Sequence, residues 1–521
     1  MSFQAPDIDY AGISPVISLT AGLCVVLLAG LFDGARQRFV ISALSLMVLA
    51  TTAGLLVWQW GEAKDLVAGA LRLDDLGIAI SLIAVVAAAF VVPLTLREPA
   101  AEDRHGDLQA LLLCSTLGMV LLAQAQNLIA LFVALELLSV PLYILCGSAL
   151  RRPSSLESGL KYLIVGSLGS ATLLYGLAFI YGASGSTDFS GISEGIGEGL
   201  ADDPLVLIGI GLAATGLAFK VSLAPFHQWT PDVYQGAPTP VTAFMAVATK
   251  AAAFCVFVRF FEVALGPSVD EWQPPLAALA AVSIAVGNIG ALGQDSLKRL
   301  LGYSGIAQGG YILAGLVVAS VTGVEALVFY LAAYALMNLP AFAVVTIRER
   351  ETPFGDDIRA VQGLGNERPG LAWPLTISML ALAGLPGTTG FIGKLFLIEA
   401  SVEGDYTWLG VAIVVGTMIS LAYYLRVVAA VWMRPAAEAP PGEEIPAIAG
   451  GAPDAEAAAE GTARASVPGR DAAGRPSGGR CPLVLTPTLL AAAATVAFGI
   501  YPGPLVDWAS NAGESLAPPF L

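Results

Sequence analysis

The stretch that decides the fold runs from Gly211 to Phe254 and reads GLAATGLAFKVSLAPFHQWTPDVYQGAPTPVTAFMAVATKAAAF. Lys220 and Lys250 lie inside its apolar runs, and the segment between them contains too many prolines to form one continuous helix. An ionisable residue inside a membrane-spanning segment is rare and is by default a candidate for function. We therefore take these two lysines as candidate proton carriers.

The composition is that of a polytopic membrane protein with an all-α fold. Hydrophobic residues make up 56% of the 521 residues and charged residues only 13%, against roughly 25% charged residues in a soluble domain. A bilayer core about 30 Å thick needs about 20 apolar residues per helix, which predicts about fourteen spans. We expect them at residues 14–32, 39–60, 76–97, 107–125, 127–149, 158–182, 204–234, 241–264, 275–293, 299–320, 324–346, 371–400, 407–433 and 482–503.

Basic residues are distributed unevenly among the loops. Short cytoplasmic loops hold an excess of Lys and Arg, and here the loops after even-numbered spans offer only Lys64 and Arg72. This bias predicts that both termini lie outside. The basic residues after odd-numbered spans are Arg36, Arg38, Arg97, Arg104, Arg151, Arg152, Lys298, Arg299, Arg348, Arg350, Arg359, Arg368 and Arg434.

The same composition argues against several other classes of protein. Outside the sided loops there is no basic patch of the kind that binds nucleic acid. The five cysteines stand singly, without C-x-x-C spacing, so we expect neither a disulfide framework nor a metal cluster. The formal net charge of −16 comes largely from the outer loops and a late linker, which makes it a property of the solvated surface.

A carboxylate lies deep in the fifth span. The segment LIALFVALELLSVPLYIL places Glu136 about 14 Å into the span at about 1.5 Å per residue, close to the bilayer midplane. Pro141 follows five residues later and has no N–H, which frees the carbonyl of Leu137 beside that carboxylate. A polar, hydratable notch is the expected result.

Two spans contain helix breakers. In span seven, Pro225 follows Lys220 closely and predicts two half-helices. In span twelve, SMLALAGLPGTTGFIGKLFL contains Pro386 within a breaker and Lys394 just beyond it. Paired interruptions in corresponding positions of two halves indicate a transport site built on internal repeats.

These breakers define the expected domain organisation. A three-helix segment (1–106) precedes two five-helix repeats (107–264 and 275–433), and the second repeat is inverted because five is odd. A flexible cytoplasmic linker (434–481), rich in Ala, Gly and Pro, leads to a C-terminal helix and tail (482–521).

The buried lysines suit proton transfer better than arginines would. A desolvated lysine can lose its proton, whereas arginine stays charged. Three of the six lysines, Lys220, Lys250 and Lys394, fall well inside spans. The alternative is an ordinary ion pair or a side chain that extends to the interface, which explains Lys161, Arg259 and Arg426 at least equally well.

Weaker polar signals accompany these groups. His227, two residues after Pro225, is positioned to pass protons between Lys220 and the cytoplasm, although a hydrogen-bonded structural histidine is the alternative. Tyr234 and Gln308 carry groups that order water. Individually these residues indicate little.

At this point the residues resemble a known family. The segments ELLSVPLYIL, PFHQWTPDVYQGAPTPVTAF, DSLKRLLGYSGIAQGGYIL, FYLAAYALMNLPAFAVV and LAGLPGTTGFIGKLFLIEA are similar to subunit N of bacterial NADH-quinone oxidoreductase (complex I), an antiporter-like membrane subunit. The resemblance covers roughly residues 107–430. It implies fourteen helices, two inverted five-helix repeats with broken helices seven and twelve, and a bacterial plasma membrane location.

The resemblance also implies roles and partners. Glu136 matches a carboxylate that pairs with the broken-helix lysine, Lys220, while Lys250 and Lys394 match the lysines of the eighth and twelfth helices. His227 matches a histidine of the hydrophilic axis. The implied partners are lipids, other membrane subunits of complex I and its peripheral arm. NADH, FMN, iron–sulfur clusters and quinone are expected in those partner subunits, and no cofactor in this chain, which would serve as a translocase subunit without a redox site.

This chain departs from the family pattern at three places. Gln308 stands where the family usually has histidine, and an amide cannot titrate near neutral pH. Thr249 replaces a proline before Lys250, and Gly387 replaces a proline in the second breaker. The changes at Thr249 and Gly387 alter the local backbone but leave the titratable lysines in place. The linker over residues 435–481 is also longer than usual for the family.

Two other functions remain open at this level. A subunit of a multisubunit sodium/proton antiporter would have no redox partner, and co-purification with an iron–sulfur arm would separate the two. A helical scaffold that has lost transport is the second alternative. The charged groups at membrane depth argue against a scaffold.

Overall fold

Apolar stretches long enough to cross a bilayer form helices along the chain, because a helix satisfies every backbone hydrogen bond within its own segment. The computed structural model describes residues 8–32, 37–96, 104–197, 199, 201–437 and 482–516. Within these residues, eleven helices are long and apolar enough to cross a membrane, and three shorter apolar helices accompany them. The predicted all-α membrane fold is confirmed.

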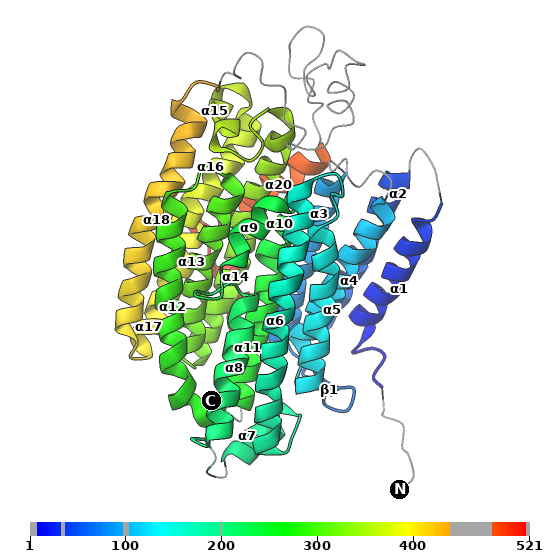
Figure 1. Cartoon of the computed structure of the whole chain (residues 1–521), viewed down its shortest axis with the longest axis vertical. Helices are drawn as coiled ribbons and strands as arrows, with labels where there is room; N and C mark the ends of the chain where they lie inside the picture. Colours follow the sequence, from blue (N-terminus) through cyan, green and yellow to red (C-terminus); the bar gives the residue numbers. More distant parts are fainter. Residues whose placement is uncertain are drawn as a thin grey trace.

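The helices run side by side in one bundle, with α1 and α2 on one flank and α17 and α18 on the other (Figure 1). The first part of the chain forms α1 (Ser14–Ala29), α2 (Gln37–Trp58), α3 (Asp75–Thr95), α4 (His105–Gln124), α5 (Leu128–Cys146), α6 (Pro153–Ser184) and α7 (Phe189–Gly197). The middle forms α8 (Pro204–Lys220), α9 (Trp229–Gly236), α10 (Thr239–Phe244), η2 (Met245–Thr249), α11 (Lys250–Val258), η3 (Arg259–Ala264), η4 (Gly266–Ser268), α12 (Val269–Leu292) and α13 (Leu297–Val317). The last part forms α14 (Val321–Glu351), η5 (Ile358–Val361), α15 (Leu364–Glu367), α16 (Pro369–Ala383), α17 (Thr389–Glu403), α18 (Thr407–Met433), α20 (Pro482–Ile500) and α21 (Gly503–Glu514).

A small hairpin between α2 and α3 was not expected from the sequence. Strands β1 (Lys64–Leu66) and β2 (Leu71–Leu73) pair antiparallel, with Lys64 opposite Leu73. Gly69 in the turn has φ +84°, a conformation that glycine adopts without strain. The hairpin closes one end of the bundle near the N-terminus of α3.

Both predicted helix breaks are present. The seventh span divides into α8, which ends at Lys220, and α9, which begins at Trp229. The twelfth divides into α16 and α17, with Gly384 after the first half at φ +78°. Inside the first break the Ala224 N–H donates to the Ser283 hydroxyl over 2.9 Å. A side chain of α12 thus satisfies a backbone N–H that lies outside any helix and has no helical acceptor.

The eighth span contains two π-helical segments that the sequence did not reveal. The segment η2 ends directly before Lys250, and η3 begins at Arg259. Such segments are rare and frequently occur at functional sites. Here they flank α11 and change the direction in which its side chains point.

A buried ion pair joins α3 to η3. The Arg259 side chain donates to the Asp74 carboxylate over 2.5 Å and to the Ala123 carbonyl over 2.7 Å, and neither charged side chain is more than 1% exposed. Asp74 also accepts from the Gly77 N–H as the N-cap of α3. Arg259 is therefore held as a structural residue between the N-terminal helices and the eighth span.

Most basic residues of the described chain gather at one end of the bundle. In Figure 1 this end carries α15, and the opposite end carries α7. We call it the basic end, defined by Arg152, Lys298, Arg299, Arg348 and Arg368. The predicted outside location of both termini stays a prediction. Arg36, Arg97 and residues 438–481 of the predicted linker lie outside the described residues.

Replacing Asp74 with alanine is expected to destabilise the protein. The Arg259 charge would remain buried without its counter-ion, and losing one partner of a buried pair costs about 3–5 kcal/mol. Thermal unfolding of the purified, detergent-solubilised protein measures the loss. Asp65→Asn in β1 is the control, because Asp65 is exposed, and equal melting of Asp74→Ala and wild type would contradict the assignment.

Candidate functional site

The three lysines predicted inside spans are all buried, with side chains of 1–3% exposure. Within the described residues none of them forms a salt bridge, and each ammonium donates to a neutral oxygen. The other three lysines each have at least one carboxylate within 4.0 Å. These pairs are Lys64 with Asp9 and Glu62, Lys161 with Glu157 and Asp232, and Lys298 with Glu349.

Lys220 ends α8 and reaches across to α5 and α6. Its Nζ donates to the Ser139 hydroxyl over 2.7 Å and to the Tyr162 hydroxyl over 3.3 Å. The Nζ atom also lies 5.5 Å from the centre of the Tyr162 ring, within the range of a cation–π interaction. Tyr162 stacks on Trp229 of α9, with ring centres 4.6 Å apart. The lysine is thus held where the two halves of the broken helix meet.

Glu136 lies beside this group but does not pair directly with Lys220. It precedes Ser139 by three residues on α5 and therefore lies on the same helix face. Its buried Oε1 atom has no hydrogen-bond partner among the described residues. The ion pair that the family resemblance implies is not formed here, because Lys220 meets α5 at Ser139, one turn further along the helix.

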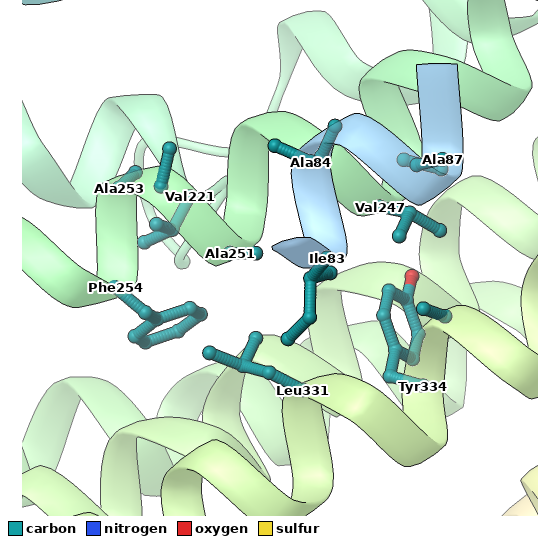
Figure 2. Packing of buried hydrophobic residues seen from close by; sticks show 14 of the residues in the cluster. Ile83, Ala84, Ala87, Val221, Val247, Ala251, Ala253, Phe254, Leu331 and Tyr334 are labelled. Carbon is teal, nitrogen blue, oxygen red and sulfur yellow. The ribbon is translucent and has the colours of Figure 1, made fainter. Parts of the chain in front are cut away.

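Lys250 follows η2 and points at α13. Its Nζ donates to the Gly305 carbonyl and lies 5.7 Å from the centre of the Tyr334 ring. A Cβ atom at Gly305 would lie only 2.9 Å from that Nζ, so a larger residue there would shift the amine. Figure 2 shows buried hydrophobic side chains of the bundle, with Val247 of η2 beside Tyr334 and Ala251 further along the eighth span.

Lys394 on α17 donates to the Leu382 carbonyl over 2.9 Å. Leu382 is the second-last residue of α16, so its carbonyl has no acceptor role within the helix and is free for a side chain. The Gln308 amide of α13 approaches the same carbonyl at 3.4 Å. The Tyr311 ring lies with its centre 5.0 Å from the Lys394 Nζ. One carbonyl at the second break thus lies between Gln308 and Lys394.

Gln308 is completely buried and also forms hydrogen bonds with two tyrosines. Its Oε1 accepts from the Tyr330 hydroxyl over 2.5 Å, and its Nε2 lies 3.3 Å from the Tyr424 hydroxyl. Tyr424 also bonds to the Ser304 hydroxyl, one turn before Gln308 on α13. Gln308 is thus the centre of a direct hydrogen-bond network, and its role in ordering water stays a prediction.

The remaining predicted residues lie around this core. His227 is half-buried in the first break, 6.4 Å between ring centres from Tyr303, and no hydrogen bond joins it to Lys220 within the described chain. Lys161 is 44% exposed and belongs to the ion pairs of α6 and α9. Tyr234 is buried on α9, and its carbonyl accepts from the Thr242 hydroxyl over 3.1 Å. Of the predicted breakers, Pro225 and Pro386 both lie in the segments between half-helices.

Several contact residues were missed at the level of sequence. Polar side chains inside apolar spans were the available signal, but which of them face the lysines depends on helix rotation. The residues concerned are Ser139, Tyr162, Tyr330 and Tyr424. No group of three His, Cys, Asp or Glu side chains in the described part of the chain is placed to hold a metal ion.

Tyr330→Phe is expected to lower stability because it leaves the buried Gln308 Oε1 without its donor. An unsatisfied buried acceptor costs about 1–3 kcal/mol, which thermal unfolding in detergent resolves. Tyr175→Phe is the matched control, since that ring is 61% exposed on α6. An unchanged melting temperature for Tyr330→Phe would show that the hydrogen bond contributes nothing.

Comparisons with known proteins place this geometry among membrane subunits of respiratory complexes. Residues 125–420 match the family model described as NADH:quinone oxidoreductase/Mrp antiporter, TM. NADH-quinone oxidoreductase subunit N of Trichlorobacter lovleyi is 37% identical over 428 residues, covering 82% of this chain and 88% of that relative. Subunit N 1 of Herpetosiphon aurantiacus is 38% identical over 441 residues, covering 83% and 89%.

Solved structures of two membrane complexes contain chains that superpose on this one over most of its length. A chain of respiratory complex I from Thermus thermophilus superposes with a TM-score of 0.76 at 33% identity, covering 95% of this chain and 99% of that one. A chain of the Mrp complex from Dietzia superposes with a TM-score of 0.77 at 20% identity, covering 97% of both chains. At that lower identity the second likeness concerns the fold alone.

Proposed function

The chain belongs to the NADH-quinone oxidoreductase subunit N family, and from this premise we propose that it relays protons through Glu136, Lys220, Lys250 and Lys394. The relay is coupled to quinone reduction in other subunits. The auxiliary groups of this proton relay are His227, Tyr234, Gln308 and Lys161.

One observation carries this proposal: the three central lysines have neutral partners, whereas the other three have carboxylates. A carboxylate holds a lysine in its charged form. A hydroxyl or carbonyl oxygen accepts a hydrogen bond from an ammonium and from a neutral amine alike. A lysine so placed can lose and regain its proton without losing its position, which is what a relay requires.

The order of the relay follows the contacts. Glu136 lies on α5 one turn before Ser139, whose hydroxyl accepts from the Lys220 ammonium. Lys250 donates to the Gly305 carbonyl of α13. One turn further along α13, the Gln308 amide approaches the Leu382 carbonyl that accepts from Lys394. Between these groups, water molecules complete the transfer, since bridging waters are nearly as favourable as direct hydrogen bonds.

The fold arrangement proposed for this relay has two inverted repeats, residues 107–264 and 275–433. Each contains a broken helix as its fourth span, α8–α9 in the first and α16–α17 in the second. Paired broken helices that meet at membrane depth are typical of transporters built in this way. The chain lies in the bacterial plasma membrane with both termini outside, in keeping with the basic end.

In the assembled enzyme the chain acts as a translocase subunit without a redox site of its own. NADH, FMN, iron–sulfur clusters and quinone are bound by partner subunits, and its neighbours are other antiporter-like membrane subunits and the peripheral arm. A sodium/proton antiporter is the other candidate. The relatives at 37–38% identity carry the oxidoreductase name, which favours the redox-linked assignment.

Lys220→Met and Glu136→Gln are each expected to lower proton pumping and quinone reduction together by about tenfold, because the two steps are coupled and about 1.4 kcal/mol of added barrier slows a rate tenfold. NADH-driven quinone reduction and acidification of membrane vesicles measure both rates on the assembled complex.

Lys64→Met is the control, because Lys64 is a paired lysine of the β1 hairpin. Normal pumping in either relay variant would contradict the relay. Sodium-dependent transport without quinone reduction would favour the antiporter instead.

A further inference from the structure

An apolar groove lies between α8 and α12, beside the first helix break. Its volume is about 390 Å³, within the range of about 300–1,000 Å³ that is typical of small-molecule sites. Its walls come from α8, from the break, from η3 and from α12. Among the lining residues are Gly211, Ala214, Pro225, Phe261, Ala278 and Val282. The small side chains at 211, 214 and 278 leave the space open.

The groove is closed at both ends by hydrogen bonds. At the end of the bundle that carries α7 (Figure 1), the Ser268 hydroxyl donates to the Ala201 carbonyl over 3.2 Å. At the deep end, the Ala224 N–H donates to the Ser283 hydroxyl over 2.9 Å. The lining residues of α12 run from Trp272 to Val282, about 15 Å at about 1.5 Å per residue. That is the depth of one leaflet, half of a hydrocarbon core about 30 Å thick.

The walls of the groove offer nothing to water. The Thr215 hydroxyl donates to the Gly211 carbonyl over 2.8 Å, and the Trp272 indole N–H donates to the Leu265 carbonyl over 3.0 Å. All other side chains that line the groove are apolar. A buried water needs about three polar partners, and an apolar cavity stays dry. Hydrocarbon is therefore the chemistry that fits this space.

The groove is continuous with the surface that faces the bilayer. Ile208 on α8 is 47% exposed, and Val282 and Ile289 on α12 are 46% and 62% exposed. Large apolar side chains so exposed on membrane-spanning helices lie against lipid. Pro225 in the break is exposed as well. A chain from the bilayer can thus enter sideways and reach the break.

The rim of the groove at the α7 end is acidic. Residues 201–205 and 265–275, which carry the starts of α8 and α12, contain Asp202, Asp203, Asp270 and Glu271 but no Lys, Arg or His. Such a rim attracts an ammonium group and repels an anionic headgroup.

We propose that this groove binds one acyl chain of a phospholipid whose headgroup carries an amine, of the phosphatidylethanolamine class. The acyl chain lies along α12 and ends against Pro225 and Phe226 at the first break, and the ammonium group meets the acidic rim. In the proposed orientation this lipid belongs to the outer leaflet. The site goes beyond the proton relay and stands whether or not the lysines carry protons.

Photochemical labelling of the assembled complex tests the groove. The complex is placed in nanodiscs of equal phosphatidylethanolamine and phosphatidylglycerol, with a trace of phosphatidylethanolamine that carries a diazirine in its acyl chain. We expect labelled peptides from residues 201–226 and 265–283. Gly211→Phe fills the groove without a clash, because a Cβ there meets nothing within 4 Å. It is expected to lower that labelling about fourfold or more, since each methylene kept out of the groove weakens binding about fourfold.

Gly54→Phe on α2 is the matched control. A Cβ at this glycine also meets open space, but the residue does not line the groove. Wild-type labelling of the groove peptides is expected in this variant. Absence of labelling in the wild type, or undiminished labelling in Gly211→Phe, would overturn the site.

The headgroup preference has its own test. The same diazirine chain on phosphatidylglycerol is expected to label the groove peptides about threefold less, the size of an exposed charge interaction. Asp270→Asn combined with Glu271→Gln should remove much of this difference, whereas Asp65→Asn combined with Glu403→Gln, two exposed carboxylates outside the rim, should keep it. Equal labelling by both lipids in the wild type would overturn the amine preference.

A high-resolution map of the wild-type complex decides the matter if Gly211→Phe fails to assemble. Tubular density of an acyl chain between α8 and α12 supports the site. A helix of a partner subunit in the groove, or an empty groove, would overturn it.

Discussion

The hydrogen bond from a buried lysine to a neutral oxygen is the interaction on which the rest of this structure depends. Each instance occurs where regular helix geometry is interrupted: Lys220 at the end of α8, Lys250 at the junction of η2 and α11, and Lys394 against the free carbonyl of Leu382 at the end of α16. The acceptors differ: the Ser139 hydroxyl of α5 for Lys220, the Gly305 carbonyl within α13 for Lys250, and the helix-end carbonyl of Leu382 for Lys394. The interruptions therefore position the amines, and at the second break they also supply the acceptor.

Buried arginines and the three central lysines have different kinds of partner in this structure. Arg259 pairs with Asp74, and Arg348 pairs with Glu367 near α15. Arginine stays protonated and its planar group matches a carboxylate, so these pairs fix elements in place. The three central lysines lack such carboxylate partners within the described chain and donate to neutral oxygens instead.

The sequence predicted the spans and both breaks because apolar length and proline are local properties. Glu136, Lys220, Lys250 and Lys394 were recognisable for the same reason: a charge inside an apolar run is visible without any knowledge of its neighbours. Their partners were not. Ser139 rather than Glu136 receives Lys220, and Gln308 bonds Tyr330 and Tyr424, because these contacts depend on helix rotation. The π-helical turns before Lys250 and at Arg259 change that rotation without an obvious sequence signal.

The position of α13 links the separate lysines into one system. Its backbone meets Lys250 at Gly305, its Gln308 side chain approaches the carbonyl that holds Lys394, and Gly309 lies against Val221 in the first break. A side chain at Gly305 would displace the amine, since a Cβ there would stand 2.9 Å from Nζ. Any displacement of α13 therefore changes the surroundings of Lys250 and Lys394 together. A single helix thus forms part of the surroundings of both lysines, which lie in different parts of the bundle.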